Sequence, residues 1–163
     1  MTISIRTEQP ADFAAVAEVV GAAFNKTDEV DLVAALRSSD AYLPEYSLVA
    51  EDDTGIVGHI FYSRLTVGGS PGIALAPLAV RPDRQKQGVG EALMRESFRL
   101  AEAAGETVVL VLGHTAYYPR VGFRPCSQVG IEGPWGHDAF MALFLGDGPH
   151  PQGWAQYPPE LSG

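Results

Sequence analysis

Hydrophobic and polar positions divide this chain into short segments with two different periods. Helical spacing covers three segments, at about residues 13–24, 28–37 and 88–104. Strand-like runs, alternating or continuously apolar, cover residues 2–6, 46–51, 56–64, 73–80, 108–112 and 139–145. Helices and strands therefore both contribute to the fold, and the turn residues 52–55 join two of the strands into a β-hairpin.

Two of the strands are apolar throughout and are separated by the longest helix. The runs 73–80 and 108–112 flank the helix 88–104, which Gly105 is expected to end. Fully apolar strands joined by a crossover helix are typical of a buried parallel pair with a right-handed connection. The sequence therefore predicts one βαβ unit.

The turn into that helix has the features of an anion site. Residues 81–83, Arg-Pro-Asp, end the strand, and Gly88 and Gly90 lie at the helix start. Glycines let the backbone approach a ligand closely, and the first N–H groups of a helix are unpaired and lie at the positive end of its dipole. Arg84 and Lys86 add positive charge. Such a corner most often binds a phosphate group.

Three other segments have a less regular pattern. Residues 68–72, Gly-Gly-Ser-Pro-Gly, predict a loop before the first βαβ strand. Residues 113–125, after the second βαβ strand, contain many side chains that can take part in chemistry. Residues 146–163 are rich in Gly and Pro and form a C-terminal tail, in which an edge strand at 154–157 remains an open alternative.

Composition excludes several classes of protein. A length of 163 residues fits one domain, and a net charge of −9, from 11 Lys and Arg against 20 Asp and Glu, argues against a nucleic-acid-binding surface. The start of the chain has no signal-peptide pattern, and no apolar run approaches the roughly 18 residues that a membrane span needs. One cysteine, Cys126, excludes an internal disulfide, and His59, His137 and His150 lack metal-ligand spacing. We therefore expect a cytoplasmic protein without a metal site.

A specific motif occupies the anion corner. Residues 85–90, Gln-Lys-Gln-Gly-Val-Gly, match Gln/Arg-x-x-Gly-x-Gly/Ala, the signature of the GNAT superfamily of N-acetyltransferases. The match extends to Pro-Leu-Ala-Val-Arg-Pro at 77–82 and to Tyr-Pro-Arg-Val-Gly-Phe at 118–123, which resembles the family's Tyr-x-x-x-Gly-Phe ending. The chain resembles most a bacterial branch of predicted acetyltransferases with the Pro-Leu-Ala-Val strand and a Tyr-Tyr pair.

The resemblance implies a fold and a domain organisation. The fold is α+β, the GNAT acyl-CoA N-acyltransferase fold, with a mixed twisted sheet of about six or seven strands, a central βαβ unit and flanking helices. The order of elements agrees over about residues 2–145. We therefore expect one GNAT domain at 1–145, followed by the tail 146–163.

The resemblance also implies a reaction and a cofactor. An acetyl group would move from acetyl-CoA, the co-substrate, to a primary amine by direct transfer in a ternary complex. The backbone at 87–90 would hold the pyrophosphate, and the backbone around Leu78 and Val80 would pair with the pantetheine arm. The residues expected to contact acetyl-CoA are Leu78, Ala79, Val80, Arg84, Gln85, Lys86, Gln87, Gly88, Val89, Gly90, His114 and Tyr117.

The expected catalytic groups are few. Tyr118 matches the family tyrosine, and its phenol would protonate the departing thiolate or hold it by a hydrogen bond, although Tyr117 could exchange roles with it. A backbone N–H near Leu78 would stabilise the oxyanion. Four candidates remain for the base that accepts the amine proton: Glu29, Asp31, His114 and solvent. Of these, Glu29 is taken as the catalytic candidate.

Partners and alternative functions remain less specific. The amine would be a small molecule or a peptide, selected by the early helices, a loop at 63–72 and the region after Gly122. A homodimer is common among similar proteins, but no motif indicates one, and no membrane partner is expected. The alternatives are an acyl-CoA-binding sensor or interaction module of GNAT fold with little turnover, and an enzyme that uses another phosphate cofactor.

Overall fold

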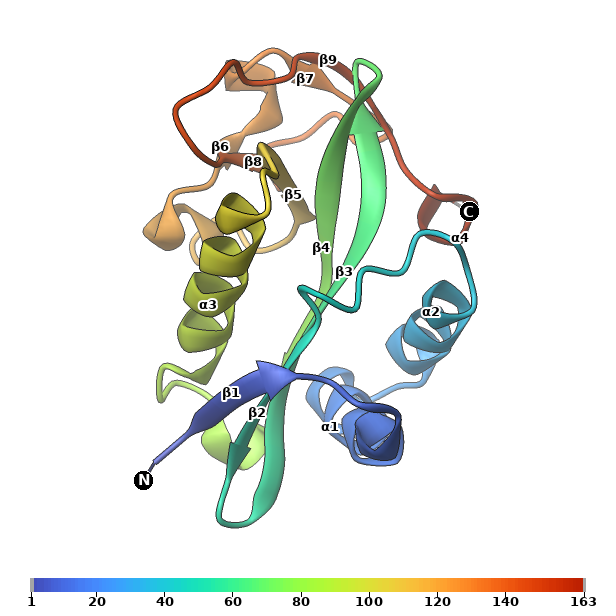
Figure 1. The fold of residues 1–163 in the computed structure, drawn as a ribbon, viewed down its shortest axis with the longest axis vertical. Helices are drawn as coiled ribbons and strands as arrows, with labels where there is room; N and C mark the ends of the chain where they lie inside the picture. Colours follow the sequence, from blue (N-terminus) through green and yellow to red (C-terminus); the bar gives the residue numbers. More distant parts are fainter. Residues whose placement is uncertain (1, 163) are drawn as a thin grey trace. The chain divides into compact units, whose positions relative to one another are not determined.

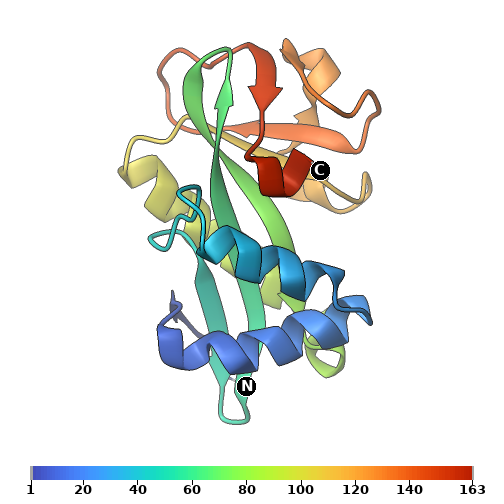
Figure 2. The same ribbon diagram turned by 90° about the vertical axis from the view of Figure 1, so that its right-hand side faces the viewer.

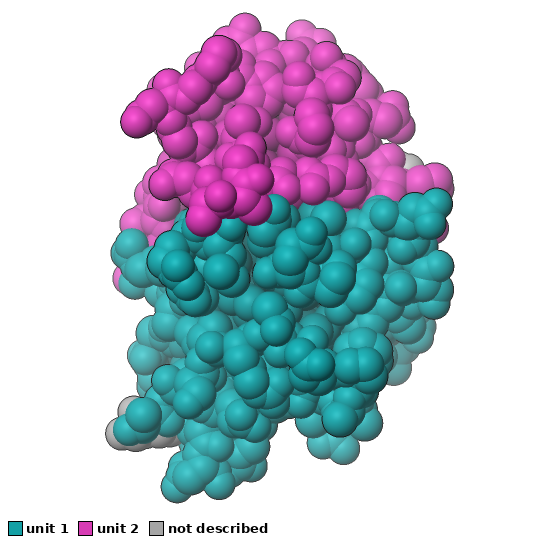
Figure 3. Space-filling model, viewed as in Figure 1, with its two compact units in different colours: residues 1–62, 77–100 teal, residues 63–76, 101–163 magenta. Residues whose placement is uncertain are grey.

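A computed structural model describes residues 2–162, and its contacts divide the chain into two compact units (Figure 3). Unit 1 comprises the residues up to 62 together with 77–100, and unit 2 comprises 63–76 and the residues from 101 onward. The chain passes between the units three times, each time inside a regular element: strand β3 (Gly55–Val67), strand β4 (Ser70–Val80) and helix α3 (Val89–Ala103). The two units are described separately.

In unit 1, antiparallel strands lie between helices. Strand β1 (Ser4–Thr7) pairs with β2 (Leu48–Asp52), and β2 pairs with the first half of β3, with a register shift between Ala50 and Glu51. Helices α1 (Phe13–Phe24), which follows the short helix η1 (Pro10–Asp12), and α2 (Asp28–Arg37) lie side by side over one face of these strands (Figures 1 and 2). Helix α3 covers the opposite face (Figure 1).

Apolar spacing explains which helix faces are buried. Val16, Val19 and Val20 of α1 pack in one cluster with Val49 of β2 and Ala79 of β4. On the other face, Gly58 of β3 makes room for α3, because a Cβ atom there would lie 2.8 Å from a methyl group of Val89. The small residue lets the helix approach the strand closely, and both helix layers exclude water from the strands between them.

Unit 2 is built on the apolar strand β5 (Val108–Leu112). It pairs in parallel with β4 and, over five residue pairs, in antiparallel with β8 (Phe140–Phe144), which also pairs with β6 (Arg124–Pro125). Strand β9 (Gly153–Gln156) pairs with the end of β3 and with β7 (Ile131–Glu132). The remaining elements are η2 (Pro82–Arg84), η3 (Tyr118–Val121), η4 (Cys126–Gln128) and α4 (Pro159–Ser162).

The predicted fold class is confirmed, because the sheet is mixed and the helices flank it. Hydrogen-bonded neighbours follow the order β1-β2-β3-β4-β5-β8-β6, and the described residues hold nine strands rather than the expected six or seven. The additional strands include β6 and β7, which have two residues each and are therefore too short to show a period. No helix among the described residues is both long and apolar enough to span a bilayer.

The prediction of a loop at 68–72 is wrong. Gly68 and Gly69 have φ angles of 56° and 86°, which lets these two residues alone connect β3 to β4. Ser70 already begins β4, so the stretch 63–72 belongs to a β-hairpin and is not a loop. Thr27 occupies the expected N-cap position of α2, but its side chain makes no capping hydrogen bond.

Candidate functional site

The turn before α3 exposes several unpaired backbone N–H groups. Lys86 and Gly88 have φ angles of 62° and 86°, and Gln87 lies between them. Among residues 2–162, no acceptor is found for the N–H groups of Gln87, Gly88, Val89 and Gly90. A Cβ atom at Gly88 would meet no atom within 4 Å, so the turn is open. Successive N–H groups in such conformations form an anion-binding concavity at the positive end of a helix.

Side chains anchor this turn to the β2–β3 hairpin. Arg84 Nε donates to Oδ2 of Asp52 at 3.0 Å, and Arg81 donates to Oγ1 of Thr54 at 3.0 Å. Hydrogen bonds from Thr54, followed by those from Arg84, lower the pKa of Asp52 to about 2. The Arg84 guanidinium is therefore already paired, whereas Lys86 is exposed and has no ion-pair partner within residues 2–162.

Strand β4 changes its environment along its length. In unit 2 its ladder with β5 comprises only two residue pairs, Ile73 with Val109 and Ala74 with Leu110. Beyond these pairs burial alternates: Pro77 and Ala79 are buried, whereas Ala76, Leu78 and Val80 are half-buried. Leu112, at the end of β5, is 42% exposed despite its apolar side chain. Both strands therefore leave apolar surface uncovered after the ladder ends.

The loop after β5 fixes Tyr118 in one orientation. Gly122 has a φ of 110° and ends the short helix η3, which turns the chain so that Phe123 packs edge-on against Tyr118, 5.6 Å between ring centroids. Tyr117 packs on the same ring at 5.1 Å. The four-residue spacing between Tyr118 and the glycine thus has a physical cause, because only a positive φ returns the chain to the tyrosine.

Tyr118 is buried, but its hydroxyl makes no hydrogen bond among the described residues. The residue is 8% exposed, and burial, together with the neighbouring Tyr117, raises its pKa to about 12. The phenol is therefore protonated at neutral pH and can donate a hydrogen bond. His114 supplies the carbonyl that accepts the N–H groups of Tyr117 and Tyr118, and its own side chain is exposed.

Of the base candidates, Glu29 has the most unusual environment. Its Oε2 is buried without a hydrogen-bond partner among residues 2–162, and Oε1 lies 3.6 Å from Nζ of Lys26. Asp31 is exposed, and both carboxylates lie in the first turn of α2, where they also favour the helix dipole. Val30, next to Glu29, packs against the cluster that contains Ala79, next to Leu78.

The sequence-selected residues thus fall into two groups. Unit 1 contains Glu29, Leu78 to Val80 and the turn 84–90, and unit 2 contains His114, Tyr117 and Tyr118. No group of three metal-ligating side chains is found among residues 2–162.

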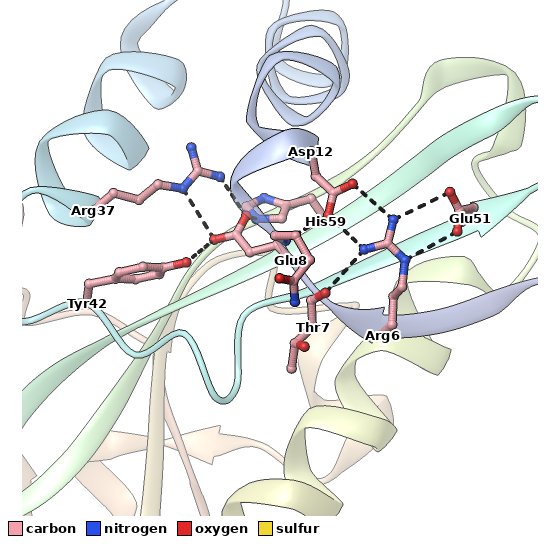
Figure 4. A network of polar contacts seen from close by, with 9 residues as sticks. Arg6, Thr7, Glu8, Asp12, Arg37, Tyr42, Glu51 and His59 are labelled. Atoms are coloured by element: carbon pink, nitrogen blue, oxygen red, sulfur yellow. Dashed lines mark hydrogen bonds and ion pairs between the residues drawn. The ribbon is translucent and has the colours of Figure 1, made fainter.

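The sequence analysis missed a buried polar cluster centred on Glu8 (Figure 4). Its carboxylate accepts hydrogen bonds from Arg37 at 2.6 Å, from the Tyr42 hydroxyl at 2.5 Å and from Nε2 of His59 at 3.1 Å. Burial opposes ionisation of Glu8, but the hydrogen bonds from His59 and Arg37 outweigh it and lower its pKa to about 2. A histidine in the apolar run 56–64 was the one available signal, because a buried imidazole needs a partner.

Burial is the largest influence on the pKa values of the other two titrating residues of this cluster, His59 and Tyr42. Burial lowers the pKa of His59 despite the Glu8 hydrogen bond, and burial followed by the Glu8 hydrogen bond raises the pKa of Tyr42. His59 is therefore neutral. Because Glu8 is ionised, Nε2 of His59 carries the proton, and its buried Nδ1 has no hydrogen-bond partner among residues 2–162.

Comparisons with known proteins agree on one family. The acetyltransferase (GNAT) domain matches residues 44–125. The protein named "Uncharacterized N-acetyltransferase YjhQ" from Escherichia coli (strain K12) is 42% identical over 121 residues, which cover 72% of this chain and 67% of that protein. "Uncharacterized N-acetyltransferase YhbS" from the same strain is 31% identical over 134 residues, covering 80% and 79% of the two chains.

Two solved structures share the fold closely. The crystal structure of the E. coli GNAT family N-acetyltransferase YhbS in complex with CoA has a TM-score of 0.91 at 27% identity, covering 99% of this chain and 92% of that one. A GNAT family acetyltransferase from Brucella melitensis in complex with acetyl-CoA has a TM-score of 0.81 at 33% identity, covering 98% of each chain.

Proposed function

This chain belongs to the GNAT acetyltransferase family, and we propose that it transfers the acetyl group of acetyl-CoA directly to a primary amine in a ternary complex. The observation that carries this proposal is the open turn at 86–90, whose N–H groups lack acceptors among residues 2–162 and lie at the positive end of α3. A pyrophosphate supplies the missing acceptors. The bound CoA and acetyl-CoA in the two related structures support the same choice of ligand.

The local structure supports a separate role for each residue of the proposed cofactor site. Gln87 to Gly90 bind the pyrophosphate through their N–H groups, and Lys86 adds a free charge. Arg84 and Gln85 act mainly by shaping the turn, since Arg84 is paired with Asp52 and Gln85 donates to the carbonyl of Val80 at 3.0 Å. The half-buried face of Leu78 and Val80 offers backbone groups and apolar surface to the pantetheine arm. The family resemblance also assigns His114 and Tyr117 to the contacts with acetyl-CoA.

The transfer step requires three things of the protein. The amine nitrogen forms a bond to the acetyl carbon, the carbon–sulfur bond breaks, and the electron pair leaves with the sulfur as a thiolate. The N–H near Leu78 stabilises the oxyanion, and Tyr118 donates to the thiolate. A phenol with a pKa of about 12 is a weaker acid than a thiol, so a hydrogen bond to the thiolate is favoured over complete proton transfer.

The amine must also lose a proton. Glu29 is the proposed acceptor, because its side chain is 21% exposed, so an amine can reach it, and its Oε2 has no hydrogen-bond donor among residues 2–162. Its neighbour Val30 packs with the cluster of Ala79, which places α2 beside the part of β4 that carries Leu78. Solvent is the alternative proton acceptor if Glu29 proves dispensable.

A two-stage experiment tests this function. Thermal unfolding is measured with acetyl-CoA, longer acyl-CoAs, NAD and ATP, and free-thiol release is then measured with pooled small amines and peptides. We expect stabilisation by CoA compounds alone and thiol release that depends on an amine. The proposal would be contradicted if ATP or NAD stabilised the protein and the CoA compounds did not. Tight binding of acetyl-CoA without any thiol release would instead identify a sensor with little turnover, for which the burial of Tyr118 is the supporting observation.

A further inference from the structure

One buried carboxylate connects four segments of unit 1. Glu8 follows β1, Arg37 ends α2, Tyr42 lies in the segment after α2, and His59 lies in β3 (Figure 4). The side chains of Glu8 and His59 have no exposed surface, and that of Arg37 is 13% exposed. Glu8 therefore cannot touch a substrate, and any role in the reaction must act through another residue.

Stability alone is a poor explanation for this cluster. A buried ion pair loses the hydration of both charges, and apolar residues of similar volume often serve stability as well or better. This cluster also leaves Nδ1 of His59 buried without a donor among residues 2–162, which is a further penalty. The cluster does provide directional contacts. Arg37 donates two hydrogen bonds to the carboxylate of Glu8, and these hold the C-terminal end of α2 in one place.

Arg37 passes this restraint on to both α1 and α2. Its guanidinium lies 3.8 Å from the ring centroid of Phe13, the first residue of α1. Arg37 and Phe13 also line a groove of about 380 Å³ between α1 and α2, whose other walls are mainly valine and alanine side chains. The far end of the same ten-residue helix carries Glu29, with its unpartnered Oε2. Because a ten-residue helix is a hydrogen-bonded segment only about 15 Å long, a restraint on Arg37 also limits the movement of Glu29.

We propose that Glu8 is a positioning residue for the amine acceptor: through Arg37 it holds α2, and with α2 the carboxylate of Glu29, in the orientation that receives the amine. The proposal rests on the proposed function, because it takes Glu29 as the group that meets the amine. It does not involve the cofactor turn at 84–90, which is anchored separately by Asp52.

The central variant is Glu8→Gln, which keeps the size of the side chain and removes the charge that faces Arg37. The matched control is Glu106→Gln in unit 2, which removes the charge from another bidentate pair, since Arg64 contacts the two oxygens of Glu106 at 2.7 and 2.8 Å. Tyr42→Phe removes one hydrogen bond to Glu8 and is mild enough to preserve folding.

The expected results separate positioning from stability. The amine is the one that supports the fastest free-thiol release in the pooled assay. In Glu8→Gln, the KM for this amine rises about tenfold or more and kcat falls, while the Kd for acetyl-CoA stays within about twofold. Amide hydrogen exchange in α2 becomes about tenfold faster, and exchange in α3 is unchanged. Tyr42→Phe shifts the same quantities in the same direction by a smaller factor, and Glu106→Gln shifts neither the amine KM nor the exchange of α2.

Two outcomes overturn the proposal. If Glu8→Gln lowers the melting temperature but has the amine KM and the α2 exchange rates of Glu106→Gln, Glu8 is only structural. The same holds if the Kd for acetyl-CoA rises as much as the KM for the amine. Absence of turnover in the wild-type protein is a different result, because it contradicts the proposed function; the exchange rates of α2 then decide whether Glu8 fixes this helix.

Discussion

The ring of Tyr118 lies directly against the backbone of Gly113, where a Cβ atom would overlap the ring carbon Cε2. Gly113 therefore sets the position of the phenol that we assign to the departing thiolate. We expect Gly113→Ala to displace this ring, to lower kcat at least tenfold and to destabilise the fold by about 1–3 kcal/mol, as overpacking does. Steady-state kinetics and chemical denaturation measure the two effects.

Gly136→Ala is the control for that substitution. A Cβ atom at Gly136 would meet no atom within 4 Å, so neither kcat nor stability should change by a comparable amount. Full activity of Gly113→Ala would show that the position of the Tyr118 ring does not matter for turnover.

The Tyr118 hydroxyl is the second testable feature. Because it makes no hydrogen bond among residues 2–162, its removal in Tyr118→Phe should leave the fold intact and reduce kcat by about 10²-fold, the usual contribution of a positioned proton donor. The affinity for acetyl-CoA, measured by calorimetry, should remain nearly unchanged.

Tyr117→Phe is measured in parallel, since the two tyrosines are adjacent and could exchange roles. A larger loss of kcat in Tyr117→Phe would transfer the role to that residue. Equal losses of kcat and of acetyl-CoA affinity in Tyr118→Phe would make Tyr118 a packing residue.

The cofactor turn allows a matched pair of glycine substitutions. Gly88 and Gly105 have φ angles of 86° and 92°, and a Cβ atom at either would meet no atom within 4 Å. Alanine at either position therefore introduces a similar strain of about 1 kcal/mol. Only Gly88→Ala should weaken the binding of acetyl-CoA, by about tenfold or more in Kd, because of these two turns only the one at Gly88 has unpaired N–H groups. Equal affinities of the two variants for acetyl-CoA would show that the turn at Gly88 does not bind the cofactor.

Stability should fall at acid pH in two stages. Burial holds the pKa of His59 below its ordinary value of 6.5, so below that pH the unfolded chain binds a proton that the folded chain does not. The pKa of Glu8 is about 2 instead of 4.5, so its contribution is present above pH 4.5 and is lost between 4.5 and 2. Both groups therefore destabilise the fold as pH falls, each with a limiting slope of about 1.4 kcal/mol per pH unit.

Denaturant titrations between pH 8 and pH 3 measure this dependence. His59→Gln should flatten the stage between about pH 6.5 and 5 and leave the lower stage in place. A wild-type free energy of unfolding that is constant between pH 7 and 5 would contradict the neutral, buried state of His59.

Much of the fold could be predicted because its signals are local. The bounds of α2 and β5 agree with the predicted 28–37 and 108–112, since a regular apolar period and a clear stop at each end define both. The hairpin at Gly68 and Gly69 was missed, because the sequence showed five turn-forming residues and only the backbone reveals that two of them suffice.

The sequence by itself determined the family and the βαβ unit, and it selected the glycine turn at 85–90 and Tyr118 as site candidates, because each signal is a short motif or a continuous periodic run. The tertiary structure alone decided that Arg84 is paired with Asp52, that Gly113 supports Tyr118 and that Glu8 joins Arg37, Tyr42 and His59. The contacts of Arg84 and of Glu8 join residues from separate segments, up to 51 positions apart. A periodic pattern records which side of an element is buried, but not which partner a buried charge meets there.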